Sequence, residues 1–250
     1  MTDIVKNYLT KIHIGAEQSF KNLSIFPLLS DYIIPFDYLT IDEAISKDLI
    51  EVMKVRKTRS APKQKVVNKS DRMILIYDGE KLVKAGHQGN IGTTILIPAK
   101  ETVVIPTSFI KKKRSFNYIH RTCPRKHANS SRFYLEHFAR VDSQVGTIFA
   151  INGKVAGMDC FGMPEVLEKM FMKMIEDYAQ KAADQVDPKM NLKSSKAGAV
   201  DFLKMARESR VQTNAAARLV SRCRLYSEMC ERYALAREDQ VLHLSLVAKN

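Results

Sequence analysis

Residues 73–109 read MILIYDGEKLVKAGHQGNIGTTILIPAKETVVIPTSF and carry the strongest β-strand signals of the chain. Met73–Tyr77, Thr93–Ile97 and Thr102–Pro106 are short apolar and β-branched runs. With Lys65–Asn68 just before them, they have the close, even spacing that is typical of a meander or sandwich. The runs are continuous rather than alternating, which predicts strands that are covered on both faces.

A pair of carboxylates follows the first of these strands. Asp78 and Glu80 lie two residues apart around Gly79. On a continuing strand they would share one face, where they would bind a cation or act as an acid/base pair. The alternative is a turn in which a carboxylate only accepts hydrogen bonds from backbone N–H groups, which is a common role of Asp in turns.

A glycine-rich polar turn comes next and reads Gly86-His87-Gln88-Gly89-Asn90. Backbone N–H groups in such a turn can form a nest for a phosphate, although a hairpin loop is the plain alternative. The spacing lacks the lysine-hydroxyl end of a P-loop. Histidine titrates near pH 6.5, so His87 suits proton transfer. We predict His87, Glu80 and Asp78 as catalytic residues, and Gly86, Gln88, Gly89 and Asn90 as ligand-binding residues.

The net charge of +13 is concentrated in the middle of the chain. Residues 51–150 hold 20 basic and 7 acidic side chains, whereas residues 1–50 carry −3 and residues 151–250 carry +3. A concentrated positive field attracts phosphates, nucleic acid or acidic proteins, although solvated basic loops are equally common.

The basic run of the middle segment mixes cations with rings. Lys111-Lys112-Lys113-Arg114 is followed by Phe116, Tyr118 and Arg121. Phosphate contact together with base stacking is typical of binding to nucleotides or single-stranded nucleic acid. We therefore add two groups of predicted ligand-binding residues, the run Lys111, Lys112, Lys113 and Arg114, and the isolated Arg121.

The N-terminal part is predicted to begin with strands and to contain one short helix. Lys11–Ile14 and Leu23–Phe26 are β-rich. Thr40 and Glu43 form a capping-box signature that starts a helix through about Ser46. A strand is expected over Leu49–Val55.

The C-terminal part has clearer signals. Asn152-Gly153 predicts a tight hairpin turn between strands over 145–160, because both turn positions need positive φ. Pro164 suits the first position of a helix that runs to about Gln185, with apolar residues at helical spacing. A second helix is expected over Ala197–Glu208, and strands return in the tail.

Composition narrows the class of protein. At 250 residues with 45% apolar side chains, the chain can bury one large core or two modest ones. The four cysteines have no paired spacing, and no membrane-spanning run occurs, which favours a cytoplasmic protein without membrane association. Cys123, His127 and His137 are zinc-ligand types, but their spacing matches no standard finger. The sequence identifies no cofactor and no oligomeric state.

An ordered set of short motifs resembles the family of the ARG and rhodanese-phosphatase-superfamily-associated protein domain. The matching pieces span nearly the whole chain: Phe20–Leu29, Leu39–Ala44, Val66–Ser70, Ile76–Glu80, Thr93–Pro98, Val104–Ser108, Gln144–Gly146, Asn152–Phe161 and His243–Ser245. The resemblance implies a companion of ADP-ribosylglycohydrolases and phosphatases that handles ADP-ribose or another NAD-derived nucleotide.

The chain departs from the family pattern at acidic and reactive positions. Lys81 stands where the family has a second acid, and Phe109 and Lys111 stand where it has a cysteine and a glutamate. These changes put any catalytic activity of the family in doubt for this chain.

Taken together, these patterns predict one α+β domain over residues 1–250. A mainly antiparallel β assembly, sandwich-like or meander, is covered by one long helix and shorter helices. Residues 111–143 form a basic insertion-like segment and residues 187–196 a polar connection. The expected function is binding, with or without processing, of an anionic nucleotide-like ligand such as ADP-ribose. The alternative is a non-catalytic basic module that binds nucleic acid or an acidic protein.

Overall fold

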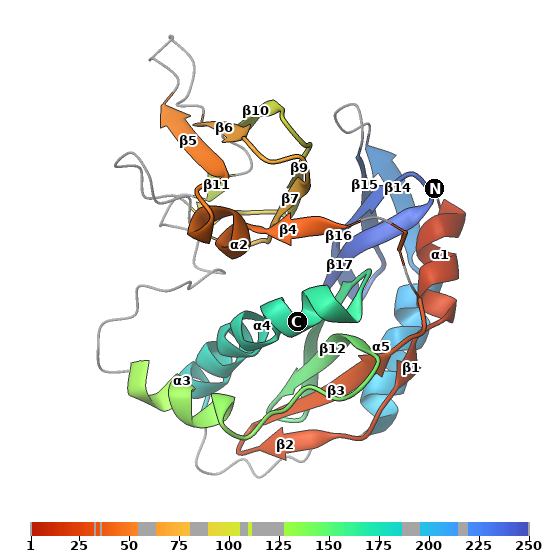
Figure 1. Cartoon of the computed structure of the whole chain (residues 1–250). Coiled ribbons are helices and arrows are strands. Elements are labelled where there is room, and N and C mark those ends of the chain that lie inside the picture. The colour runs from red at the N-terminus through yellow and green to blue at the C-terminus, as the bar shows by residue number, and fades with distance from the viewer. Residues whose placement is uncertain are drawn as a thin grey trace. The chain divides into compact units, whose positions relative to one another are not determined.

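The computed structural model describes residues 2–32, 34–35, 37–54, 64–80, 90–105, 110–111, 128–186, 196–214 and 220–249. In these residues the fold is α+β with mainly antiparallel sheets, as predicted (Figure 1). Contacts between residues divide the chain into two compact units. Unit 1 comprises residues 1–34 and 121–250, and unit 2 comprises residues 35–120.

Unit 1 is built on a nine-stranded sheet with the order β1-β3-β12-β13-β17-β16-β15-β14, in which β2 also pairs with β3. All of its described pairs are antiparallel. Its elements are α1 (Thr2–Thr10), β1 (His13–Ile14), β2 (Gln18–Phe20), β3 (Leu23–Leu29), α3 (Ala128–Leu135), β12 (Gln144–Ile151), β13 (Lys154–Phe161), α4 (Pro164–Asp184), α5 (Lys196–Glu208), β14 (Arg210–Asn214), β15 (Ser221–Tyr226), β16 (Cys230–Arg237) and β17 (Gln240–Ala248).

The predicted hairpin joins β12 and β13. Its turn residues Asn152 and Gly153 have φ values of 51° and 78°, as the Asn-Gly signal requires. Through β13, this hairpin pairs with β17, so the C-terminal strands belong to the same sheet. Residues at both ends of the chain therefore share one sheet in unit 1.

Helix α4 confirms the long helix that Pro164 predicts. Pro164 occupies its first turn, where a missing N–H costs nothing. Its buried residues follow the predicted stripe, and they include Val166, Leu167, Met170, Phe171, Met174, Ile175, Tyr178 and Ala182. This stripe packs on β3, β12 and β13.

The first residues form a helix, so the prediction of a strand-like opening is wrong for α1. Val5, Tyr8 and Leu9 are fully buried and recur at helical spacing. Asp3 lies in the first turn, where its negative charge interacts favourably with the helix dipole. The guanidinium of Arg207 donates to the carbonyl of Leu9 in the last turn and to that of Ile12 just after the helix.

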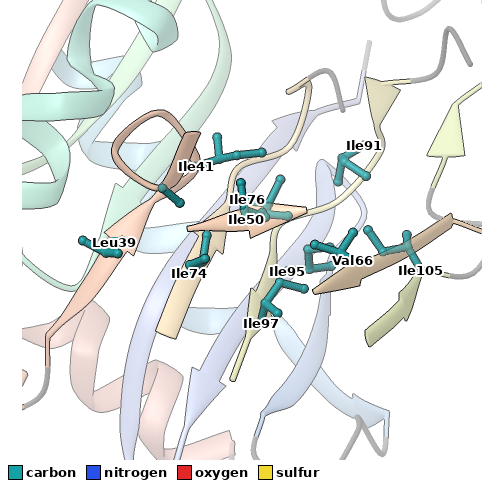
Figure 2. Packing of buried hydrophobic residues seen from close by; sticks show 11 residues of the cluster. Leu39, Ile41, Ile50, Val66, Ile74, Ile76, Ile91, Ile95, Ile97 and Ile105 are labelled. Atoms are coloured by element: carbon teal, nitrogen blue, oxygen red, sulfur yellow. The ribbon is translucent and has the colours of Figure 1, made fainter. Parts of the chain in front are cut away.

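Unit 2 has a hydrophobic core of its own (Figure 2). Its elements are β4 (Tyr38–Thr40), α2 (Ile41–Ser46), β5 (Ile50–Lys54), β6 (Gln64–Asn68), β7 (Met73–Ile76), β8 (Asn90–Ile91), β9 (Ile95–Ile97), β10 (Thr102–Ile105) and β11 (Ile110–Lys111). The core cluster comprises Leu39, Ile41, Ala44, Ile50, Val66, Ile74, Ile76, Ile91, Ile95, Ile97 and Ile105.

The strands of unit 2 divide between small sheets instead of following one meander. β10-β6-β5 and β4-β7-β9 are three-stranded, and β11 pairs with β8. β4 and β7 are parallel, and the long connection that a parallel pair requires contains α2, β5 and β6. The spacing of the strands was readable from the sequence, but their partners were not.

Helix α2 begins with the predicted capping box. The Thr40 hydroxyl accepts a hydrogen bond from the Glu43 backbone, and the Glu43 carboxylate accepts one from the Thr40 backbone at 2.8 Å. Both otherwise unpaired N–H groups are satisfied.

None of the described helices is long and apolar enough to cross a membrane.

Candidate functional site

The two predicted carboxylates lie in a tight turn after β7. The strand ends at Ile76, and Gly79 takes a φ of 93°, which only glycine adopts readily. Asp78 and Glu80 are therefore not on one face of a continuing strand, and that interpretation is wrong. Because Gly79 has a left-handed backbone conformation, the chain turns between Asp78 and Glu80 and the strand does not continue to Glu80.

One oxygen of Glu80 holds this turn closed. The backbone N–H of Tyr77 donates to Glu80 Oε2 at 2.9 Å. This is the capping role that the sequence offered as the alternative to catalysis. Asp78 is 5% exposed and Glu80 is 6% exposed. The backbone N–H of Asp78 donates to the Thr94 hydroxyl at 3.2 Å. Both carboxylates are thus held in a largely buried turn.

Backbone hydrogen bonds connect this turn to β8. Gly79 N donates to Ile91 O at 2.7 Å, and Ile91 N donates to Glu80 O at 2.9 Å. In turn, β8 pairs with β11, which places Asn90 directly opposite Lys111. We call the segments 78–80, 90–91 and 110–111 the Asp78 corner. It brings together the backbones of four predicted site residues.

The remaining predicted site residues lie outside the described residues. They are Gly86, His87, Gln88, Gly89, Lys112, Lys113, Arg114 and Arg121. The segment that holds His87 starts and ends in the Asp78 corner, since Glu80 and Asn90 flank it. The run that starts with Lys111 leaves from the same corner.

The described residues offer no group of three metal-ligand side chains in binding geometry. Cys123 and His127, two of the zinc-ligand types in the sequence, lie outside the described part. The third, His137, has its ring stacked on Phe20 at 3.5 Å between centroids. Its Nδ1 lies 2.7 Å from the carbonyl oxygen of Phe133. These contacts give His137 a structural role in unit 1.

A buried polar cluster in unit 1 was not predicted. His243 Nε2 lies 3.5 Å from Asp159 Oδ1, and the Tyr178 hydroxyl donates to Asp159 Oδ2 at 3.3 Å. Asp159, His243 and Tyr178 are 3%, 3% and 4% exposed. The only signal in the sequence is that Asp159 and His243 interrupt apolar strands. Their closeness depends on the register between β13 and β17, which the sequence does not state.

Cys160 does not complete a nucleophilic triad with this pair. Consecutive strand residues point to opposite faces, so Cys160 lies on the other side of the sheet from Asp159. Its thiol is fully buried. Burial raises the pKa of Cys160 well above its usual value, and the charge of Asp159 raises it further. The cluster thus combines an acceptor, an imidazole and a hydroxyl without a reactive thiol.

Comparison with known proteins supports the resemblance that the motifs indicate. No curated protein and no solved structure matches the chain. Residues 11–115 and 110–247 match the family described as ARG and Rhodanese-Phosphatase-superfamily-associated Protein domain. The two matches include the Asp78 corner and the strands that carry Asp159 and His243. The chain therefore belongs to the family of the ARG and Rhodanese-Phosphatase-superfamily-associated Protein domain.

Proposed function

We propose that this protein binds an anionic nucleotide-like ligand, such as ADP-ribose or another NAD-derived nucleotide, at the Asp78 corner. The observation that carries the proposal is the backbone pairing of Asn90 with Lys111 beside the Asp78–Glu80 turn. It makes the glycine-rich polar segment and the lysine-rich run start from one place. A phosphate nest and a set of cations are the two elements that a pyrophosphate needs.

Charge and family membership support the same ligand class. The excess of positive charge lies in residues 51–150, which include the whole corner. The family name associates its members with ARG and with rhodanese-phosphatases. The resemblance of the motifs implies a companion of ADP-ribosylglycohydrolases and phosphatases, and ADP-ribose is therefore the first ligand to test.

Processing of the ligand would use a smaller set of residues than the sequence suggested. Glu80 Oε2 is engaged by the backbone of Tyr77, so Glu80 serves the turn. His87 and Asp78 are the proposed acid/base residues, because a histidine can take up or release a proton near neutral pH. Binding does not depend on this step.

A thermal-shift panel tests the proposal. The panel contains ADP-ribose, NAD, ADP and AMP, each at millimolar concentration. A ligand at 100 times its dissociation constant adds about 2.7 kcal/mol of apparent stability. We expect a shift with ADP-ribose that Lys111→Ala reduces. Lys47→Ala, an exposed lysine at the end of α2, is the matched control and keeps the shift. The absence of a shift with every nucleotide would reject the proposal.

The uneven charge also favours a second candidate, in which the same basic segment holds nucleic acid or an acidic protein. If phosphates dominate that contact, the logarithm of the affinity falls with the logarithm of salt concentration by about 0.7 per phosphate on a single strand. Replacing Lys111, Lys112, Lys113 and Arg114 by Ala flattens this slope. An unchanged slope in that variant places the contact elsewhere.

A further inference from the structure

The two faces of the nine-stranded sheet are covered differently. The Tyr178 hydroxyl on α4 bonds to Asp159, so α4 lies on the Asp159 face. α5 belongs to the opposite face, since Ser209 directly after it lies 3.7 Å from the sulfur of Cys230. On the Asp159 face, α4 packs over β3, β12 and β13. The described part of unit 1 supplies no further helix for this face over β14 to β16.

A row of directly opposed residues shows which side chains share this face. It runs from Asp159 on β13 through Ser245, Tyr233 and Arg224 to Gln212 on β14. Directly opposed residues in antiparallel strands point to the same side of a sheet. The row therefore begins on β13, which α4 covers, and continues across β17, β16 and β15 to β14 on an open surface.

Exposure increases along that row. Asp159 and Ser245 are 3% and 4% exposed, whereas Tyr233 is 40% exposed. In one neighbouring row, Arg222 on β15 lies between Leu235 on β16 and Asn214 on β14. In the row on the other side, Arg210 on β14 lies opposite Tyr226 on β15. The open surface thus presents arginines beside tyrosine rings.

Charge on this surface is predominantly positive. Glu231 is the acidic residue beside these arginines; it accepts from Arg224 at 3.2 Å and lies 3.8 Å from the Lys249 ammonium group. The Arg224 guanidinium also lies 5.7 Å from the centre of the Tyr226 ring. Burial lowers the pKa of Arg222, and the neighbouring Tyr233 hydroxyl acts in the opposite direction.

We propose that this surface binds single-stranded nucleic acid; we call it the Tyr233 face, and it comprises Arg210, Arg222, Arg224, Tyr226 and Tyr233. Arginines on an open sheet neutralise phosphates, and exposed rings accept stacked bases. An acidic peptide would engage the same arginines but would gain nothing from the rings. The Tyr233 face belongs to unit 1, whereas the Asp78 corner belongs to unit 2.

The test uses a labelled oligouridine and fluorescence anisotropy on the full-length protein. Base stacking on an aromatic side chain is lost in Tyr233→Ala, so the affinity falls by about fivefold or more. Tyr233→Phe keeps the ring and retains most of the affinity. Phe133→Ala removes an aromatic side chain of α3 that is 58% exposed, and it leaves binding unchanged.

Charge variants test the phosphate contacts. Arg224→Gln reduces the salt slope by about 0.7, as expected for one phosphate on a single strand. Lys204→Gln, an exposed lysine on α5, is the control and leaves the slope unchanged.

Three results would overturn the proposal. The first is the absence of oligouridine binding by the wild-type protein. The second is an affinity in Tyr233→Ala equal to that of the wild type while the Lys111–Arg114 variant loses binding, which would place the nucleic acid on unit 2. The third is that polyglutamate displaces the oligouridine as well as unlabelled oligouridine does, which would identify an acidic protein as the occupant.

Discussion

Gly157 lies where a side chain cannot fit. A Cβ at this position would stand 2.5 Å from the Tyr178 hydroxyl and 2.6 Å from the Leu246 carbonyl oxygen. Backbone cannot move aside as a flexible side chain can, so Gly157→Ala forces β13, β17 and α4 apart. We expect a loss of about 1–3 kcal/mol in the free energy of unfolding, measured with urea.

Gly15→Ala is the matched control for that variant. Its nearest contacts would be Pro27 atoms at 3.4 Å, which is ordinary packing distance. The stability of this variant should change by less than about 1 kcal/mol. Equal losses in the two variants would show that the packing of α4 on β13 is not as described.

Cys160 is expected to be unreactive in the folded protein. The reactive species is the thiolate, and burial raises the pKa of Cys160 well above its usual value. Between pH 7 and 9, labelling by a disulfide reagent should therefore follow unfolding of the chain. In urea the unfolded thiol ionises near pH 8.5, and labelling accelerates as the pH rises towards that value. Fast labelling of the Cys160 peptide in native protein, seen by mass spectrometry, would contradict its burial.

At the scale of elements, the capping box of α2 makes a direct prediction. Thr40→Ala removes the hydroxyl that accepts from the Glu43 backbone, while the first turn of the helix stays in place. We expect a loss of about 0.5–2 kcal/mol in urea unfolding. Ser46→Ala, at the exposed end of the same helix, is the control and should change the stability by less than about 0.5 kcal/mol.

Local signals explain which elements the sequence predicted. The capping box, the Asn152-Gly153 turn and Pro164 each act within a few residues, and all three lie where expected. α1 was missed because the apolar spacing of Val5, Tyr8 and Leu9 was not recognised in so short a helix. β14 was missed because its alternating polar residues resemble a loop, although it pairs with β15, the next strand along the chain.

The candidate site was predicted only in part for the same reason. The sequence identified the Asp78–Glu80 turn and the Lys111 run as polar segments within a β-rich region. The pairing of Asn90 with Lys111 joins them, and a two-residue ladder leaves no periodic signal. The Asp159–His243 contact likewise depends on register across β13 and β17. Long-range pairing, rather than residue type, limits what the sequence can reveal.

At the scale of the whole molecule, unit 1 should survive a break in its chain. Residues 187–195 connect the α4 segment to α5, yet β13 and β17 pair across that connection. A protease recognition sequence placed there and cut should leave two fragments that elute together under native conditions. Their separation into two independently folded pieces would contradict the shared sheet.

Binding of a nucleotide-like anion at the Asp78 corner is the proposed function of the chain. Hydrogen exchange of the full-length protein, with and without ADP-ribose, tests it most directly, because exchange slows where a ligand covers or orders backbone amides. We expect added protection in residues 77–80, 90–91 and 110–111, and less protection in the Lys111→Ala variant at the same ligand concentration. Unchanged exchange in these three segments at saturating ADP-ribose, or protection confined to residues 221–235 of the Tyr233 face, would contradict it.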